Sequence, residues 1–324
     1  MQTFSAVFPG FTKDESGYIA RMTERFQLDN HSVSPTADGL IRDFEKLCYH
    51  QEEPFGSSSP YAQFKVFEEA KLNQVKVLLD GQGADETLGG YDKYIHWFLQ
   101  ELLRKHPRKQ AQERRALKKN NRIFAWGWKN YLAAFYPAQT AFQLERREAR
   151  KISQMQDISK AFRQQYFDRP SIYKPMVLKL NDILYFDSCR FGLEELLRLA
   201  DRNSMAHGVE TRLPYLNHEL VQFLFSLPAG FKIRDGWTKW LLRKSMSGLL
   251  PDEVLWRKDK IGFEPPQKNW MENAGLKEYI QEARRKLVQK GILEPKVLNK
   301  KIQPQDAPAA DNYDWRYLVA AAFA

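Results

Sequence analysis

The sequence predicts an α/β fold built on a truncated parallel sheet with large helical additions. In residues 1–95, short apolar segments with strand character alternate with amphipathic helical patterns, which is typical of a parallel sheet. Beyond these residues the 324-residue chain is patterned mostly as helix. We therefore interpret residues 1–324 as one domain with a sheet part (1–95), a helical insertion (96–180) and a second helical part (181–324).

The first 95 residues supply few strands for a doubly wound sheet. Strand character is found at residues 3–8 (TFSAVF), 30–34 and 75–79 (VKVLL), and helical spacing at 14–26, 37–48 and 61–71. The largely apolar VKVLL segment predicts a strand that is covered on both faces. After Tyr91 the pattern is helical, with breaks at Pro214, Pro228, Pro251 and Pro265-Pro266.

Composition and charge exclude several classes of protein. No apolar run approaches the roughly 20 residues that span a bilayer, and two cysteines give neither a disulfide framework nor a metal-ligand spacing. We expect no membrane partner and a cytoplasmic location. The net charge of +10 lies largely in a run that only Glu113 interrupts. The run consists of Arg104, Lys105, Arg108, Lys109, Arg114, Arg115, Lys118, Lys119 and Arg122. It favours a solvated helical face over a nucleic-acid site.

The strongest chemical signal is the loop that follows the VKVLL strand, residues 80–91. Ligands of open α/β sheets bind beyond the carboxyl ends of the strands. Gly81 and Gly83 allow a close approach of backbone amides to a ligand, and Asp85 and Glu86 place hard oxygen ligands beside it. A plain glycine-rich turn with acidic helix-start residues is the alternative, because such loops are weak signals by themselves.

Residues 201–216 interleave charges with apolar side chains. Charges in such surroundings are often partly buried and must then pair, so a structural network such as Asp201–Arg212 is one reading. His207 could be a general base, although an ordinary polar contact is the simpler interpretation. A third group contains Lys239, Arg243 and the loop lysine Lys260; fixed cations there would stabilise charge developing on a phosphate or an oxyanion.

Taken in order, these segments resemble the C-terminal synthetase domain of asparagine synthetases, whose relatives include β-lactam synthetases and lasso-peptide cyclases. The matching stretches read LDGQGADETLGGY, DRNSMAHGVETRLPYL, TKWLLR and RKDKIGFEPP. The resemblance implies a sheet of the adenine-nucleotide alpha-hydrolase (PP-loop) type. It also implies an ATP-dependent amide-forming ligase, in which a carboxylate attacks the α-phosphate of ATP and an amine attacks the acyl-AMP.

The resemblance also implies roles for individual residues. Lys260 and Gln82 occupy catalytic positions, and Asp85 matches the Mg²⁺-pyrophosphate ligand. The ATP-binding positions are Ala6, Asp80, Gly81 and Gly83, and the supporting positions are Glu86, Asp201, Glu210, Arg212, Lys239 and Arg243. The implied cofactors are ATP and Mg²⁺. The implied substrate is a small carboxylate, aspartate or an analogue, with ammonia from a glutaminase domain that this chain lacks. A homodimer is left open.

Two substitutions depart from the family pattern. Gln82 stands where a glutamate is common, and a glutamine orients groups by hydrogen bonds but takes no proton at neutral pH. Asp80 replaces a serine and adds a negative charge near the phosphates. Together they indicate an amidotransferase paralogue rather than a housekeeping asparagine synthetase.

One motif of the family is missing from the sequence. No SGGxDS phosphate loop occurs, and neither Cys48 nor Cys189 lies near the start as a glutaminase cysteine would. We therefore expect an incomplete piece of a ligase that makes no amide and hydrolyses no glutamine by itself. A non-catalytic fragment or pseudoenzyme and a basic nucleic-acid-binding protein are the alternatives. We also expect the strands at 3–8 and 75–79 to be unpaired with each other, and Gly81, Asp85 and Lys260 to converge on one cleft.

Overall fold

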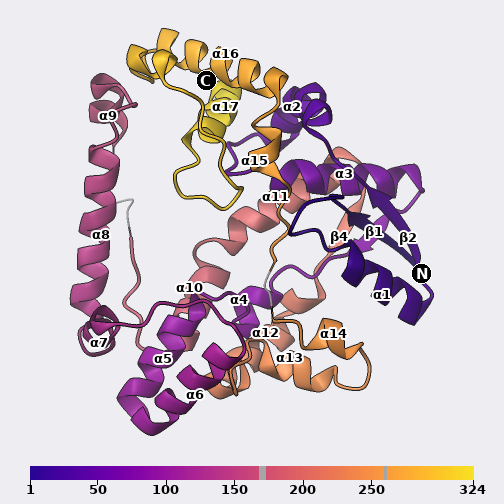
Figure 1. Cartoon of the computed structure of the whole chain (residues 1–324), viewed down its shortest axis with the longest axis vertical. Coiled ribbons are helices and arrows are strands. Elements are labelled where there is room, and N and C mark those ends of the chain that lie inside the picture. The colour runs from indigo at the N-terminus through magenta and orange to yellow at the C-terminus, as the bar shows by residue number, and fades with distance from the viewer. Residues whose placement is uncertain (168–172, 259–260) are drawn as a thin grey trace.

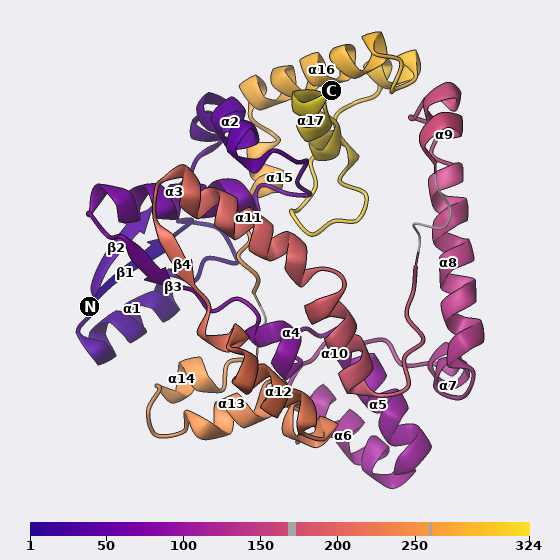
Figure 2. The same ribbon diagram turned by 180° about the vertical axis from the view of Figure 1, so that it is seen from behind.

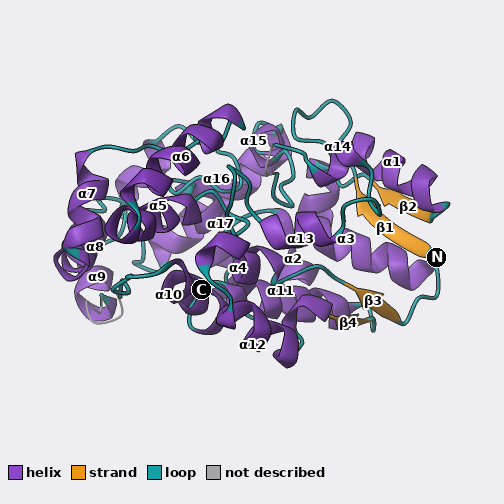
Figure 3. Ribbon diagram, turned by 90° about the horizontal axis from the view of Figure 1, so that it is seen from below, coloured by secondary structure: helices purple, strands orange, loops and turns teal. Residues whose placement is uncertain are grey.

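A computed structural model of the chain describes residues 1–167, 173–258 and 261–324. Its described strands form two separate parallel pairs (Figure 3). β1 (Gln2–Ala6) pairs with β2 (Asp29–Val33), and β3 (Val77–Leu79) pairs with β4 (Glu210–Arg212). The prediction that the first strand and the VKVLL strand do not pair is thus confirmed. The second helical part supplies β4, which the sequence did not reveal.

Helix α3 (Ser59–Leu72) covers both strand pairs. Its Phe67 and Ala70 are buried, and both Phe4 of β1 and Leu78 of β3 pack against the cluster that they form. The other face of β3 is open: Val77 and Leu79 are 41% and 73% exposed. The expectation that this strand is covered on both faces was therefore wrong, because only one helix layer packs on it.

Of the remaining helices of the sheet part, the first two follow the predicted periodicity, and the third lies in the segment that was predicted as a loop. They are α1 (Ser16–Phe26), α2 (Ala37–Gln51) and the short α4 (Ala84–Leu88). Thr36 caps α2 by accepting a hydrogen bond from the Gly39 amide at 3.1 Å. The apolar face that α2 buries was expected from the spacing of Leu40, Phe44 and Leu47.

The helical insertion extends away from the sheets (Figure 1). Its helices are α5 (Tyr94–Lys105), α6 (Pro107–Lys119), α7 (Trp128–Phe135), α8 (Pro137–Ser153) and α9 (Lys160–Tyr166). The far end of the insertion is anchored to the C-terminal part. Ile158 forms an antiparallel bridge with Leu293, and the Ser159 amide donates to the Ile292 carbonyl at 2.9 Å.

The second helical part begins with two helices that lead back to the sheet, α10 (Leu180–Cys189) and α11 (Leu193–Ala206). After β4, shorter elements follow: η2 (Pro214–Leu216), α12 (His218–Ser226), η3 (Ala229–Phe231), α13 (Trp240–Ser245), α14 (Asp252–Leu255) and α15 (Gln267–Trp270). The chain closes with α16 (Ala274–Gln289), η4 (Pro295–Asn299) and α17 (Tyr313–Phe323). Figure 2 shows α10 and α11 crossing the back of the molecule.

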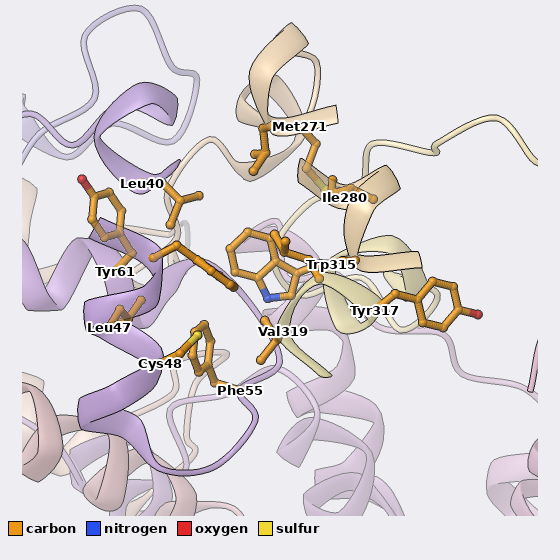
Figure 4. Packing of buried hydrophobic residues seen from close by; sticks show 14 of the residues in the cluster. Leu40, Leu47, Cys48, Phe55, Tyr61, Met271, Ile280, Trp315, Tyr317 and Val319 are labelled. Atoms are coloured by element: carbon orange, nitrogen blue, oxygen red, sulfur yellow. The ribbon is translucent and has the colours of Figure 1, made fainter. Parts of the chain in front are cut away.

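The main hydrophobic core lies between α2, α3, α16 and α17 (Figure 4). Leu40, Leu47 and Trp315 are fully buried there, and Ile280 of α16 meets them. A second core joins α5 to α10 through residues such as Phe98 and Leu184. The first core thus includes helices of the sheet part, and the second joins the insertion to α10.

The basic run is only partly the solvated face that was expected. Lys105, Arg115 and Lys118 are exposed, but Arg122 is buried. Arg104 donates to the carbonyls of Ala134 and Leu178, and its burial lowers the pKa of its guanidinium. Arg104 therefore links α5 to later parts of the insertion, whereas Arg122 contacts Asp92 and Thr238, which lie outside it.

Candidate functional site

The site begins where β3 ends. The Asp80 amide donates to the Arg212 carbonyl at 2.9 Å, which continues the pairing of β3 with β4 by one residue. The Asp80 carboxylate accepts hydrogen bonds from the amides of Gly81 and Gln82, which lower its pKa, while burial, the larger effect, raises it. The acidic group is thus folded onto the amides of its own loop.

Gly83 allows this loop to lie directly on η2. It has a φ of +89°, and a Cβ atom there would lie 2.2 Å from Cδ2 of Leu216. The Thr87 hydroxyl donates to the Gly83 carbonyl at 2.7 Å and fixes the first turn of α4. A residue with a side chain could not be accommodated without moving Leu216, so the glycine is required by packing as well as by backbone conformation.

Asp85 of α4 faces the segment that precedes α13. Its Oδ1 atom lies 2.8 Å from Nζ of Lys239, with the two side chains 18% and 24% exposed. Gly90 closes α4 by donating its amide to the Asp85 carbonyl at 2.8 Å. A Cβ on Gly90 would lie 1.8 Å from Oδ1 of Asp85, so the ion pair depends on this glycine.

Buried guanidinium groups support Lys239. Arg122 donates to the Thr238 hydroxyl at 2.8 Å and pairs with Asp92 at 3.1 Å. Arg243 donates to the Thr238 carbonyl at 2.9 Å. Burial and the charges of Arg122 and Arg257 lower the pKa of Arg243 to about 10. Positive charge concentrated in this way around Thr238 and Lys239 suits an anionic ligand such as a phosphate.

The loop that carries the fourth motif is anchored at both ends. On one side, Arg257 pairs at 2.7 Å with Glu15, the residue that precedes α1. On the other, the Ser59 hydroxyl donates to the Phe263 carbonyl at 2.8 Å, and Lys13 pairs with Glu264 at 2.6 Å. Lys260 lies outside the described residues, so the predicted convergence of Gly81, Asp85 and Lys260 stays a prediction.

Comparison with known proteins agrees with this arrangement. A sequence model of the asparagine synthase family matches residues 1–323. The chain belongs to the asparagine synthase family. The mixed α/β fold with its small parallel sheet is accordingly of the PP-loop type that the family shares.

Relatives in the asparagine synthase family are similar over most of this chain. Asparagine synthetase [glutamine-hydrolyzing] 1 of Bacillus subtilis is 25% identical over 84% of the chain and 44% of its own length. Asparagine synthetase [glutamine-hydrolyzing] 3 of the same organism is 26% identical over 76% of the chain and 35% of its own length. Amidase chry2 of Gibberella zeae is 24% identical over 81% of the chain and 42% of its own length. The chain spans less than half the length of these relatives.

The remaining positions that the family resemblance marked are dispersed. Glu86 points away from Asp85 and accepts a hydrogen bond from the Tyr91 hydroxyl at 2.7 Å. Ala6 ends β1, opposite Val33, in the other strand pair. The structure therefore brings Asp80, Gly81, Gly83, Asp85, Lys239 and Arg243 to one region, with Gln82 in the same loop.

The charges of residues 201–216 do not form the buried Asp201–Arg212 network that was one reading of the sequence. Arg212 pairs with Glu210 at 2.8 Å on the exposed face of β4, which raises the pKa of Arg212, and Asp201 is exposed on α11. These side chains stay hydrated because the face of β4 that bears them is open. Among these charged residues, Arg212 touches the loop through its main chain, where its carbonyl accepts the Asp80 amide.

His207 is a core residue rather than a polar contact. Its ring lies 4.3 Å from the ring of Phe64, and burial lowers its pKa to about 4. A neutral imidazole held against an aromatic ring, away from the loop after β3, has no access to the reacting groups. This environment favours a packing role for His207 over that of a general base.

The described residues fit Mg²⁺ only as part of a metal–nucleotide complex. No group of three His, Cys, Asp or Glu side chains that could hold a metal occurs among them. Mg²⁺ is commonly bound by one or two carboxylates together with phosphate oxygens, and the partly exposed Asp85 suits that role. The part of the chain that is described contains no helix long and apolar enough to cross a membrane.

Sequence reasoning missed the residues that support the site. Thr238 lies in the TKWLLR stretch that the sequence marked, but its partner Arg122, 116 positions earlier, belongs to no spacing with chemical meaning. The same holds for Lys93 of the first half, which pairs with Asp187 of α10. The aspartate after the GGY sequence, Asp92, was the one local signal that could have indicated a basic partner.

Proposed function

We propose that this chain forms the nucleotide- and acyl-binding part of an ATP-dependent amide-forming ligase. One observation carries the proposal: segments far apart in the sequence meet on the loop after β3. The Arg212 carbonyl binds the Asp80 amide, Leu216 lies against Gly83, and Lys239 pairs with Asp85. The loop follows the carboxyl end of a parallel strand, where ligands of open α/β sheets bind.

In the proposed reaction, an oxygen of the substrate carboxylate attacks the α-phosphorus of ATP, and the bond to the departing pyrophosphate breaks. The nitrogen of ammonia then attacks the acyl carbon of the acyl-AMP, AMP leaves, and the nitrogen loses a proton. Lys239 and the guanidinium of Arg243 stabilise the negative charge of the phosphates. Mg²⁺ held by Asp85 would neutralise part of the charge on the leaving pyrophosphate.

The side chain of Gln82 has an orienting role in this proposal. An amide donates and accepts hydrogen bonds but does not take up a proton at neutral pH. Gln82 therefore positions the acyl-AMP or the incoming ammonia, and the proton of the nitrogen passes to solvent. Lys260 is proposed to stabilise the charged transition state, as the family resemblance implies.

The proposed partners follow from the family. Aspartate or an analogue is the carboxylate, ATP with Mg²⁺ is the energy source, and ammonia comes from a glutaminase domain. A further strand that carries the SGGxDS loop would lie between β1 and β3. In the described part of the chain each has one strand neighbour, and both Phe4 and Leu78 pack against the same helix, α3. Assembly as a homodimer is part of the same proposal.

The test compares this chain with a version extended upstream by a strand and an SGGxDS loop. Pyrophosphate release is measured with ATP, Mg²⁺, aspartate or an analogue, and ammonia. We expect negligible release from the chain alone, because losing preorganised phosphate donors typically costs orders of magnitude in rate. We expect release from the extended version and its loss in Asp85→Asn. An extended protein with no release above the Asp85→Asn background would contradict the proposal.

A non-catalytic relative of the same fold is the second candidate. The substitutions Gln82 and Asp80 favour it, because one removes a base and the other adds a charge where phosphates are expected. In that case the extended protein would bind Mg·ATP but release no pyrophosphate with any carboxylate. Restoring Gln82→Glu and Asp80→Ser together would then be expected to raise turnover from that background.

A further inference from the structure

A cavity of about 790 Å³ adjoins α4, the helix whose Asp85 pairs with Lys239. Its wall is formed by α4 and α5, by α8 of the insertion, and by α10 and α11. Glu86, the residue after Asp85, reaches into this wall from α4. Figure 2 shows α8 standing alongside α5 and α10, so the helical insertion supplies one side of the cavity.

The inner end of the cavity is acidic. Glu86 is only 4% exposed and accepts a hydrogen bond from Tyr91, whose pKa is raised by burial and by Glu86, so the phenol keeps its proton. No cationic side chain among the described residues pairs with Glu86. Lys93 is nearby, but its ammonium lies 2.5 Å from Asp187 and is neutralised there. A buried carboxylate that has a phenol donor but no paired cationic side chain favours a cationic group of a ligand.

The outer part of the cavity is aromatic. The ring of Phe186 lies 5.7 Å from that of Tyr173 and 6.0 Å from that of Phe191. Tyr173 and Phe191 are 62% and 68% exposed, so large apolar surfaces are left open at the edge of the cavity. Trp97 of α5 contributes a further ring to the wall. Rings left exposed in this way can stack on the flat or apolar body of a ligand.

The volume decides what kind of acid fits. Pockets of roughly 300–1,000 Å³ enclose drug-sized ligands, and this cavity lies towards the upper end of that range. Aspartate, a four-carbon acid, would leave most of it empty and would bring no apolar group to the aromatic edge. The wall therefore matches a longer molecule with a polar end and an aromatic end.

We infer that this cavity binds the acyl substrate, and that the substrate is an ammonium-bearing carboxylic acid with an aromatic body rather than aspartate. The ammonium lies against Glu86, the aromatic body lies against Tyr173 and Phe191, and the carboxylate lies at α4 towards the nucleotide. This inference rests on the proposed function for the identity of the acid as a substrate. The binding itself can be measured without nucleotide.

The test is calorimetric titration of the whole chain, without ATP, with three probes. Tryptophan carries an ammonium and an aromatic body, phenylpropionate lacks the ammonium, and aspartate lacks the aromatic body. We expect tryptophan to bind at least tenfold more tightly than either of the others. Equal affinities for tryptophan and aspartate would overturn the inference.

Two variants locate the binding. Glu86→Gln keeps an acceptor for Tyr91 and should weaken tryptophan about tenfold without changing phenylpropionate, whereas Glu219→Gln on the exposed surface of α12 should change neither. Phe191→Ala removes an exposed ring, so folding is preserved. This variant should bind both tryptophan and phenylpropionate more weakly. Tryptophan affinity that is unchanged in both variants would overturn the inference. Binding as expected without pyrophosphate release from the extended protein would count against the ligase proposal and against the role of the bound acid as a substrate, while the binding site itself would stand.

Discussion

Nζ of Lys239 lies 2.8 Å from Oδ1 of Asp85, although the two residues come from opposite halves of the chain. The pair joins α4 of the sheet part to the segment before α13, and Gly90 leaves the space in which it forms. A positive charge thus already lies beside the carboxylate that is proposed to meet Mg·ATP. The pair therefore serves both to hold two segments together and to shape the phosphate site.

The two side chains should be coupled in stability. Lys239→Ala and Asp85→Ala are each expected to lower the free energy of unfolding, and the double variant to lose less than their sum. The coupling expected for a pair that is about one-fifth exposed is about 1 kcal/mol, measured by urea unfolding in a double-mutant cycle. Lys244→Ala, at an exposed position of α13, is the matched control. Strict additivity would show that the ion pair contributes nothing.

Asp80→Ser should raise the affinity for nucleotide. In the structure the Asp80 carboxylate accepts hydrogen bonds from the amides of Gly81 and Gln82. These two amides could otherwise donate to a phosphate. Replacing the carboxylate frees two donors and removes a negative charge, which is expected to tighten Mg·ATP binding about tenfold, or ~1.4 kcal/mol. Asp311→Ser at an exposed position controls for net charge. Weaker binding in Asp80→Ser, with Asp311→Ser unchanged, would mean that the carboxylate organises the loop instead.

Gly90→Ala should disrupt the site and destabilise the fold. The new methyl group would lie 1.8 Å from Oδ1 of Asp85 and 2.4 Å from Cε of Lys239. Overpacking of this kind costs about 1–3 kcal/mol, which thermal unfolding would detect as a lower midpoint. Gly17→Ala in α1 is the control, because nothing lies within 4 Å of its added methyl. The same midpoint in the two variants would contradict the packing described at Gly90.

The fold was predictable from the sequence wherever periodicity decides it. The faces of α1, α2 and α3 follow from their apolar spacing, and β1 follows from an apolar segment that leads into the turn at Pro9-Gly10. β4 could not be predicted, because Glu210, Thr211 and Arg212 lack strand periodicity. They form a strand because they pair with β3, in which Val77, the partner of Glu210, lies 133 positions earlier in the chain.

The candidate site was predictable in its local motifs and not in its contacts. The glycines and acids of residues 80–91 have a recognisable order, and Lys239 follows a threonine as in the family. Nothing local indicates that Arg122, at the end of a basic run, turns inward to Thr238. Burial of a long charged side chain is decided by the fold around it, as is the exposure of Glu210 and Arg212.

His207 should make stability depend on pH. Burial lowers its pKa in the folded protein to about 4, whereas the unfolded chain titrates near the ordinary value of 6.5. The unfolded state therefore binds more protons between these values, so stability is lost as pH falls from 6.5 towards 4. We expect a loss on the order of 1 kcal/mol between pH 7 and pH 5, and a smaller loss in His207→Gln. His218→Gln, at an exposed position, should keep the full dependence; an identical slope in His207→Gln would contradict this account.

The central claim is that the loop after β3, together with Lys239, binds the phosphates of ATP. Calorimetric titration of the whole chain with Mg·ATP tests it most directly, with Lys239→Ala and Lys244→Ala as a matched pair. We expect Mg·ATP to bind saturably to the unaltered chain, about tenfold more weakly to Lys239→Ala, and with unchanged affinity to Lys244→Ala. Equal affinities in all three proteins, or no saturable binding in any of them, would contradict it.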